Sequence, residues 1–277
     1  MDEVWRLLIT SPATGGRNMA VDEAVLEAVA SGQSPPTLRF FEWEPACLSL
    51  GHAQAPEVLD LGALASLGWH WVRRPTGGRA LLHTDELTYS VIAPEGLPGL
   101  AAGVLPSYQF LSRGLLAGLG VLGLRPDPPA LTVVGAAERS NPVCFEVPSA
   151  YEITAAGKKL IGSAQLRRRG AVLQHGSLPL RGDITRVVRA LRYPSEEDRR
   201  QAADRLRRHA TTLEEQLGRI VAFDEAAASM VEGFRAALGW SIVDGRLTAG
   251  ENSLAQQLQS ALYRAAEQPT APAGGAA

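Results

Sequence analysis

The run RRPTGGRALLH, residues 73–83, joins two β-prone segments through a turn rich in proline and glycine. Gly77 and Gly78 allow backbone amides to approach a ligand closely, and the flanking arginines can neutralise an anion. The same residues also fit a glycine hairpin with solvated arginines. Because the run lacks the pattern of a Walker phosphate loop, the residue types leave both interpretations open.

Short β-prone segments continue on both sides of this turn. They occupy residues 38–43, 47–50, 69–74, 80–83 and 87–92, and a second group occupies residues 150–154, 158–165 and 171–180. Helical spacing of apolar residues predicts helices over residues 18–30, 56–67 and 106–122. The pattern predicts an α+β fold with a mixed, largely antiparallel β-sheet core flanked by helices.

Beyond Gly182 the sequence becomes helical. Asp183, Ser195 and Thr212 stand where helix-capping residues are expected. We therefore predict a sheet domain over residues 1–182 and a helical C-terminal region over residues 183–266 packed on it. The last segment, residues 267–277, is rich in Ala, Pro and Gly and is expected to be a frayed tail.

The composition excludes several classes of protein. The 277 residues are 45% hydrophobic and 20% charged, and they contain no uninterrupted apolar run of about 18 residues, so neither a membrane span nor a disordered chain is expected. The 27 basic and 29 acidic residues give a net charge of −2, which offers no global attraction for nucleic acid. The five histidines show no metal-binding spacing, so no metal site is predicted. Two cysteines and an N-terminus without a signal-peptide pattern indicate a cytoplasmic protein.

A second run that could carry binding or catalytic residues is GKKLIGSAQ, residues 157–165, which is followed by His175-Gly176. Glycines inside β-prone segments suggest that something approaches the strand backbone. Period-2 alternation places Lys159 and Ser163 on one face of the strand, and Lys158 and Gly162 on the other. One lysine can thus enter a cleft while its neighbour stays in water. His175 fits either a base or a hydrogen-bonded strand histidine.

The two cysteines differ in their surroundings. Cys47 stands in an apolar strand segment and is expected to be buried packing. Cys144 stands in a loop-like stretch bounded by prolines, ahead of the Lys158-Lys159 pair. A nearby cation there would lower the pKa of the thiol and favour a thiolate nucleophile.

Together these runs resemble the lipoate and octanoate protein ligase and transferase family, which shares its fold with biotin protein ligases. The resemblance covers residues 5–190 and includes, besides the two runs above, the segments NMAVDEA at 18–24 and SLGHAQ at 49–54. The segment CFEVPSAYEI, beginning at Cys144, resembles the octanoyltransferases that use a cysteine in this loop. Ligases more often have an Asn-Asp pair where this chain has Tyr151-Glu152, which argues against ATP-dependent ligation.

The resemblance implies a site and a reaction. Cys144 would accept octanoate from octanoyl-acyl carrier protein and pass it to the lipoyl-domain lysine of a glycine-cleavage H-type protein. Lys159 would steady the thiolate and hydrogen-bond the acyl carbonyl. The expected substrate-binding residues are Arg73, Gly77, Gly78, His83, Gly162, Ser163, His175 and Gly176, with His83 ordering its strand rather than acting as a base, and Arg73 being either structural or a phosphate contact.

Further expectations and alternatives follow from the same resemblance. A transferase of this kind uses a pre-activated donor, so no cofactor is expected. The protein is expected to be a monomer that binds neither nucleic acid nor membrane. The alternatives are an ATP-dependent lipoate-protein ligase, in which Lys159 holds a lipoyl-adenylate, and a non-catalytic lipoyl-binding or carrier-binding protein.

Overall fold

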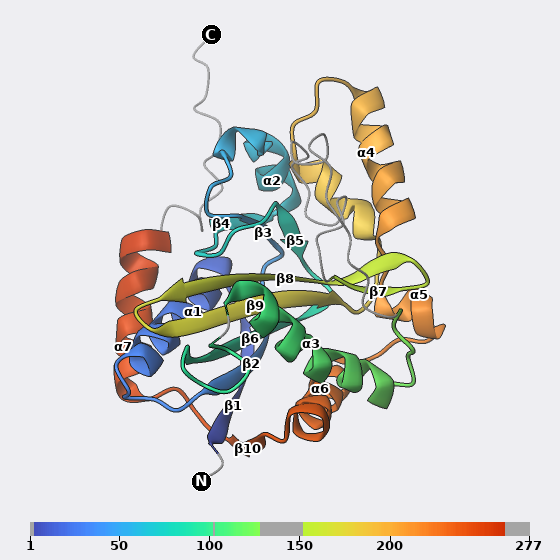
Figure 1. Cartoon of the computed structure of the whole chain (residues 1–277). Helices are drawn as coiled ribbons and strands as arrows, with labels where there is room; N and C mark the ends of the chain where they lie inside the picture. Colours follow the sequence, from blue (N-terminus) through green and yellow to red (C-terminus); the bar gives the residue numbers. More distant parts are fainter. Residues whose placement is uncertain (1–2, 102, 128–151, 264–277) are drawn as a thin grey trace.

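The main sheet of the protein has seven strands in the order β10-β1-β2-β6-β9-β8-β7 (Figure 1). A computed structural model describes residues 3–101, 103–127 and 152–263. Strand β1 runs parallel to both β2 and β10, and the remaining neighbours are antiparallel. The strands are β1 (Val4–Ala13), β2 (Thr37–Trp43), β6 (Glu86–Pro94), β7 (Ile153–Ala155), β8 (Lys158–Arg168), β9 (Ala171–Pro179) and β10 (Ser241–Asp244). The predicted mixed, largely antiparallel sheet is confirmed.

A second, three-stranded sheet carries the run at residues 73–83. Its central strand β3 (Cys47–Leu50) pairs parallel with β4 (His70–Arg73) and antiparallel with β5 (Leu81–His83). Because β3 lies between β4 and β5, the hairpin interpretation of this run is wrong. The Pro-Gly segment instead crosses over the end of β3.

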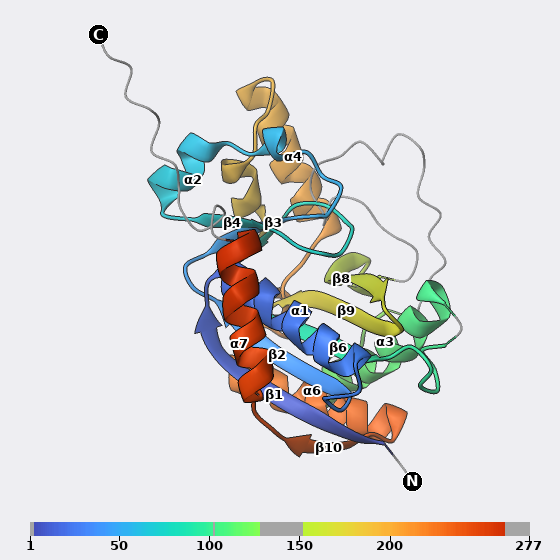
Figure 2. The same ribbon diagram turned by 90° about the vertical axis from the view of Figure 1, so that its left-hand side faces the viewer.

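Helices cover both faces of the main sheet. On one face lie α1 (Gly15–Ala30), α7 (Ala249–Leu258) and the π-helical turn Gln259–Tyr263; Figure 2 shows α7 lying along α1. On the other face lie α3 (Val104–Val121) and α6 (Phe223–Leu238). Neighbouring residues of β2 serve different cores, since Phe40 packs with α3 and α6 whereas Phe41 packs with α1. Cys47 is completely buried in the α1 core, as predicted.

A third core lies between the small sheet and the helices beside it. These are α2 (Leu61–Leu67), the 3₁₀ turn Ile184–Ala190 and α4 (Glu196–His209). The helix expected over 56–67 is split into a 3₁₀ turn, Pro56–Val58, and α2. The extended backbone of Leu59 ends the first turn. Asp60 then caps α2, because its side chain accepts a 2.9 Å hydrogen bond from the amide of Ala63.

The chain beyond residue 183 forms helices, among them the short α5 (Leu213–Leu217), but it does not form helices alone. It also supplies β10, which extends the main sheet, and α7, which is fastened to β1 by a buried ion pair. In that pair Arg6 donates to both carboxylate oxygens of Glu251, at 2.8 and 2.6 Å. The boundary at residue 182 remains a prediction. Within the described part of the chain, no helix is both long and apolar enough to cross a membrane.

Candidate active site

A pocket lies where the small sheet meets α1 and the main sheet, and it encloses about 460 Å³ including its open mouth. The small sheet and its crossover segment form one wall, and β8 with β9 forms another. Most of the lining is apolar or backbone. The lining residues are Met19, Trp43, Ser49, Arg74, Gly78, Leu81, His83, Thr88, Gly162, Ser163, Ala164, His175 and Gly176. The structure thus brings together six residues expected at the substrate site: Gly78, His83, Gly162, Ser163, His175 and Gly176.

Glycine is required at Gly176 of β9, where the neighbouring strand β8 approaches closely. A Cβ added there would lie 2.5 Å from Ser163 Oγ and 2.6 Å from Gly162 O. Ser163 Oγ in turn lies 2.6 Å from the buried hydroxyl of Tyr89. The missing side chain therefore lets β8 and β9 form a smooth wall beside the pocket.

His83 is held on both sides by hydrogen bonds. Its Nδ1 lies 2.5 Å from Glu86 Oε1, and its Nε2 lies 2.8 Å from Ser49 Oγ. Because a carboxylate oxygen accepts, Nδ1 donates to Glu86, and Nε2 shares a hydrogen bond with the Ser49 hydroxyl. The ring also stacks on Trp43, with centroids 3.9 Å apart. Both ring nitrogens are thus occupied in ordering the pocket wall.

His175 has the same arrangement around a different carboxylate. Its Nδ1 donates to Asp22 Oδ2 at 3.3 Å, and its Nε2 accepts from the Thr76 hydroxyl at 2.6 Å. Burial lowers the pKa of His175 and outweighs the opposing effect of Asp22. Burial also opposes ionisation of Asp22, but Arg39 and His175 outweigh it and hold the pKa of Asp22 below its usual value. The pocket wall therefore carries a neutral imidazole beside a buried carboxylate paired with arginine.

Replacing His175 should reduce the pH dependence of stability between pH 7 and 5. The native protein binds fewer protons at His175 than the unfolded chain does, so the free energy of unfolding falls as the pH drops below about 6.5, the ordinary pKa of histidine. Denaturant unfolding at both pH values should show a smaller fall for His175→Gln than for the parent protein. The exposed His209, replaced in the same way, is the control and should keep the parental slope. An unchanged slope in His175→Gln would show that this imidazole is protonated in the folded state.

Arg73, Arg74 and Gly77 lie around the crossover segment. Arg73 Nη1 donates to the carbonyl oxygens of Gly51 (3.0 Å), His52 (3.0 Å) and Gln54 (2.5 Å), outside the pocket. Arg74 is buried and donates to the Gly77 and Arg79 carbonyls, both at 2.8 Å, and to Ser49 Oγ at 3.0 Å. Both guanidinium groups therefore hold the shape of the crossover.

Lys159 is not among the residues that line the pocket. Its side chain is only 5% exposed and its ammonium donates to Glu152 Oε1 in a short, buried ion pair. The proposed nucleophile, Cys144, and the neighbouring Tyr151 lie outside the described residues. The expected meeting of Cys144 with Lys159 thus remains a prediction.

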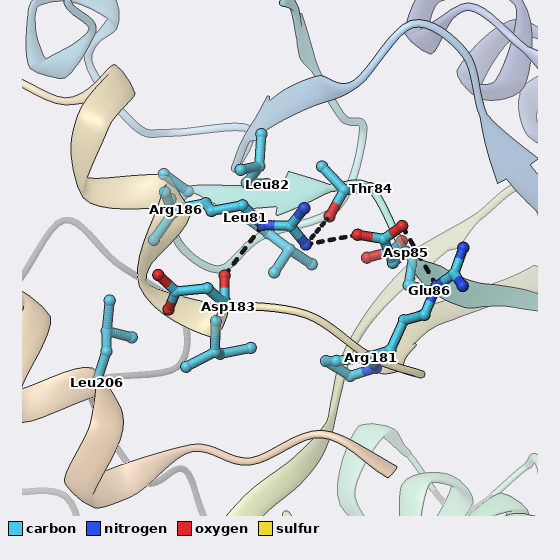
Figure 3. A pocket seen from close by; sticks show the side chains of 13 residues that line it. Leu81, Leu82, Thr84, Asp85, Glu86, Arg181, Asp183, Arg186 and Leu206 are labelled. Atoms are coloured by element: carbon cyan, nitrogen blue, oxygen red, sulfur yellow. Dashed lines mark hydrogen bonds and ion pairs between the residues drawn. The ribbon is translucent and has the colours of Figure 1, made fainter. Parts of the chain in front are cut away.

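A second pocket lies on the other side of β5, against α4 and the 3₁₀ turn Ile184–Ala190 (Figure 3). Asp85 stands between two arginines there, 2.7 Å from Arg186 Nη2 and 3.6 Å from Arg181 Nε. Arg186 also donates to Thr84 Oγ1 at 2.8 Å. These ion pairs tie the chain after β9 to the β5–β6 turn, which accounts for the charged residues at the mouth of this second pocket.

Sequence reasoning missed several residues of the first pocket, namely Met19, Trp43, Ser49, Leu81, Thr88 and Ala164, and it left Arg74 open as either a structural group or an anion contact. Met19 and Ser49 stand within segments that carried the family resemblance, which was the available signal. Trp43 and Thr88 gave none, because each stands in an ordinary strand. Within the described residues, no cluster of three or more His, Cys, Asp or Glu side chains could hold a metal ion.

Comparison with known proteins defines the class to which this fold and pocket belong. The family model of the lipoyl protein ligase A/B catalytic domain matches residues 15–235. Among solved structures, a bi-partite lipoate protein ligase from Thermoplasma acidophilum has a TM-score of 0.77 at 25% identity, covering 95% of this chain and 94% of that chain. A lipoate-protein ligase A bound with ATP also has a TM-score of 0.77, at 24% identity, which supports the fold alone. The chain belongs to the lipoyl protein ligase A/B catalytic domain family.

Relatives that are similar in sequence carry a more specific name than the family model does. Octanoyltransferase LipM of Kyrpidia tusciae is 44% identical over 268 residues, which cover 93% of this chain and 96% of that protein. Octanoyltransferase LipM of Symbiobacterium thermophilum is 43% identical, covering 95% of this chain and 97% of its own length. The predicted family and fold class are therefore confirmed.

Proposed function

We propose that the protein is an octanoyltransferase that moves an octanoyl group from octanoyl-acyl carrier protein, through a thioester on Cys144, to the lipoyl-domain lysine of a glycine-cleavage H-type protein. The observation that carries this proposal is the name octanoyltransferase LipM, shared by relatives that are 36–44% identical across most of the chain. The narrow, mostly apolar pocket supports it, because an alkyl chain gains free energy from such surroundings.

The first transfer exchanges one thioester for another. The Cys144 thiolate attacks the octanoyl carbonyl carbon, a new carbon–sulfur bond forms, and the bond to the carrier sulfur breaks. The carrier thiolate leaves and takes up a proton. The two thioesters are nearly equal in energy, so no nucleotide is needed.

The second transfer forms the amide. The acceptor lysine loses a proton, and its neutral amine attacks the acyl carbonyl carbon of the acyl-enzyme. The carbon–nitrogen bond forms, the bond to the Cys144 sulfur breaks, and the nitrogen releases a second proton to the departing thiolate or to water. Conversion of a thioester to an amide is downhill. Lys159 would supply the positive charge that both steps use, because an ammonium beside the thiolate lowers its pKa and stabilises the oxyanion in each transition state. This role requires Lys159 to exchange its contact with Glu152 for the reacting groups.

The test is transfer without ATP. Purified protein incubated with octanoyl-acyl carrier protein and an H-type acceptor should add one octanoyl group to the acceptor lysine, as measured by intact-protein mass spectrometry. An acceptor that is modified only when ATP and a free acid are supplied would contradict the proposal.

The second candidate is an ATP-dependent lipoate-protein ligase. It is favoured by a solved structure that shares the fold, the bi-partite lipoate protein ligase from Thermoplasma acidophilum, which is 25% identical to this chain. In that case Lys159 would contact a lipoyl-adenylate and Cys144 would take no part. Modification that requires ATP and survives Cys144→Ala would support the ligase.

A further inference from the structure

We propose that the C-terminal end of α4 is the surface on which the protein docks the acidic acyl carrier protein that brings the octanoyl group. The inference rests on the proposed function, since it identifies how such an enzyme recognises its donor. We call this surface the basic end of α4 and define it by the last-turn residues Arg207, Arg208 and His209, all of which are exposed. Figure 1 shows α4 at the edge of the molecule.

Charge is divided unevenly along α4. Its first turn holds three acidic residues, and its last turn holds three basic ones. In the first half of the helix, Glu197 balances Arg200 at 2.6 Å. Near the end, Asp204 balances Arg207 at 2.9 Å, but Arg208 forms no ion pair with a carboxylate of the described residues. The positive charge of Arg208 is therefore available at the surface for an anionic partner.

The basic end of α4 lies beside the proposed catalytic lysine. The chain leaves the helix at Ala210, which pairs with Lys159 in a parallel bridge, and the amide of Thr211 donates to the carbonyl oxygen of Lys159 at 3.0 Å. The chain from Arg208 to Ala210 spans at most about 7 Å. The helix dipole favours cations at any helix C-terminus, but it does not require that end to lie at the reacting strand. A carrier held there is close to the residue at which its thioester must react.

The charge of this surface suits the donor better than the acceptor. Acyl carrier proteins are acidic, so their carboxylates are attracted to an arginine that lacks a carboxylate partner. The acceptor instead brings a lysine ammonium to the reacting sulfur, and neighbouring cations repel it. Because the whole chain carries a net charge of −2, it attracts an acidic protein only through a local basic surface. Attraction of this kind weakens as the salt concentration rises.

The test compares Arg208→Glu with the parent protein, using donors with and without the carrier. With octanoyl-acyl carrier protein the variant should have a KM about tenfold higher and an unchanged kcat, because a repelling charge replaces an attracting one. With octanoyl-phosphopantetheine, which keeps the arm and its phosphate but lacks the carrier protein, the variant should match the parent. Calorimetric titration with holo-acyl carrier protein should show the same loss of affinity, and added salt should weaken binding more in the parent than in the variant.

Arg200→Glu is the matched control. Arg200 is exposed on the same helix, about 12 Å along the axis from Arg208, and pairs with Glu197. Its replacement makes the same change of charge and should leave the KM for the carrier near the parental value.

Four results would overturn the proposal: no effect of Arg208→Glu, an equal effect of Arg200→Glu, a loss that persists with octanoyl-phosphopantetheine, or a rise in the KM of the acceptor instead of the donor. Holo-acyl carrier protein that binds through Arg208 while the parent transfers no octanoyl group would uphold the docking surface and show that the proposed function fails, which is a distinct outcome.

Discussion

Cys144→Ser is expected to abolish octanoyl transfer, with a loss larger than that of the other variants considered. A serine hydroxyl is almost wholly un-ionised at neutral pH without a dedicated base, so it cannot replace a thiolate as the acyl acceptor. The measurement is the rate of acceptor octanoylation with octanoyl-acyl carrier protein at saturating concentration. No acyl-enzyme should accumulate in the variant.

Cys47→Ser provides the matched control for this loss. Cys47 is completely buried beside α1, so its replacement should lower stability but should leave the rate per folded molecule near that of the parent protein. A Cys144→Ser protein that retains more than a tenth of the parental rate would show that the sulfur does not carry the acyl group.

Lys159→Ala is expected to slow transfer roughly a hundredfold or more, because removing one donor to a developing oxyanion raises the barrier by about 2.7–4 kcal/mol. The loss should appear in kcat rather than in KM, since the ammonium acts most strongly on the transition state. Steady-state kinetics with octanoyl-acyl carrier protein would separate the two effects.

Lys158→Ala is the control for Lys159, because it removes the same charge from the adjacent residue. Lys158 is half-buried and pairs in register with Ala155, whereas Lys159 is buried against Glu152. Lys158→Ala should keep the rate within about threefold of the parent, in line with ordinary surface substitutions. Equal losses in the two variants would mean that net charge on β8, rather than the Lys159 ammonium, supports the reaction.

The sequence predicted the local elements of the fold better than their connections. Alternation and turn residues located most strands, including β2, β6, β8 and β9. The position of β3 between β4 and β5 could not be predicted, because strand pairing depends on contacts between distant segments that alternation does not record. Strands β1 and β10 were missed: β1 has four consecutive buried residues instead of alternation, and β10 buries only Ile242 among its four residues.

In the candidate site too, the sequence predicted residues that belong to local patterns and missed residues that are brought there by long-range contacts. Gly78, Gly162 and His175 were found because they belong to glycine-rich runs with a family resemblance. Trp43 and Thr88 both line the pocket, and a hydrogen bond joins them across 45 residues of sequence. No local sequence pattern reveals such a contact. The buried partners Glu86 and Glu152 were also not expected at the site, since a carboxylate gives no sequence signal for the cation or imidazole that it will meet.

The central claim is that octanoate passes through Cys144, and trapping the acyl-enzyme tests it most directly. The protein is incubated with octanoyl-acyl carrier protein without an acceptor, then digested and mapped by mass spectrometry before and after hydroxylamine treatment. We expect one octanoyl group on Cys144, removed by hydroxylamine and transferred when the acceptor is added. An adduct on Cys47, or none under conditions where the acceptor becomes octanoylated, would contradict the claim.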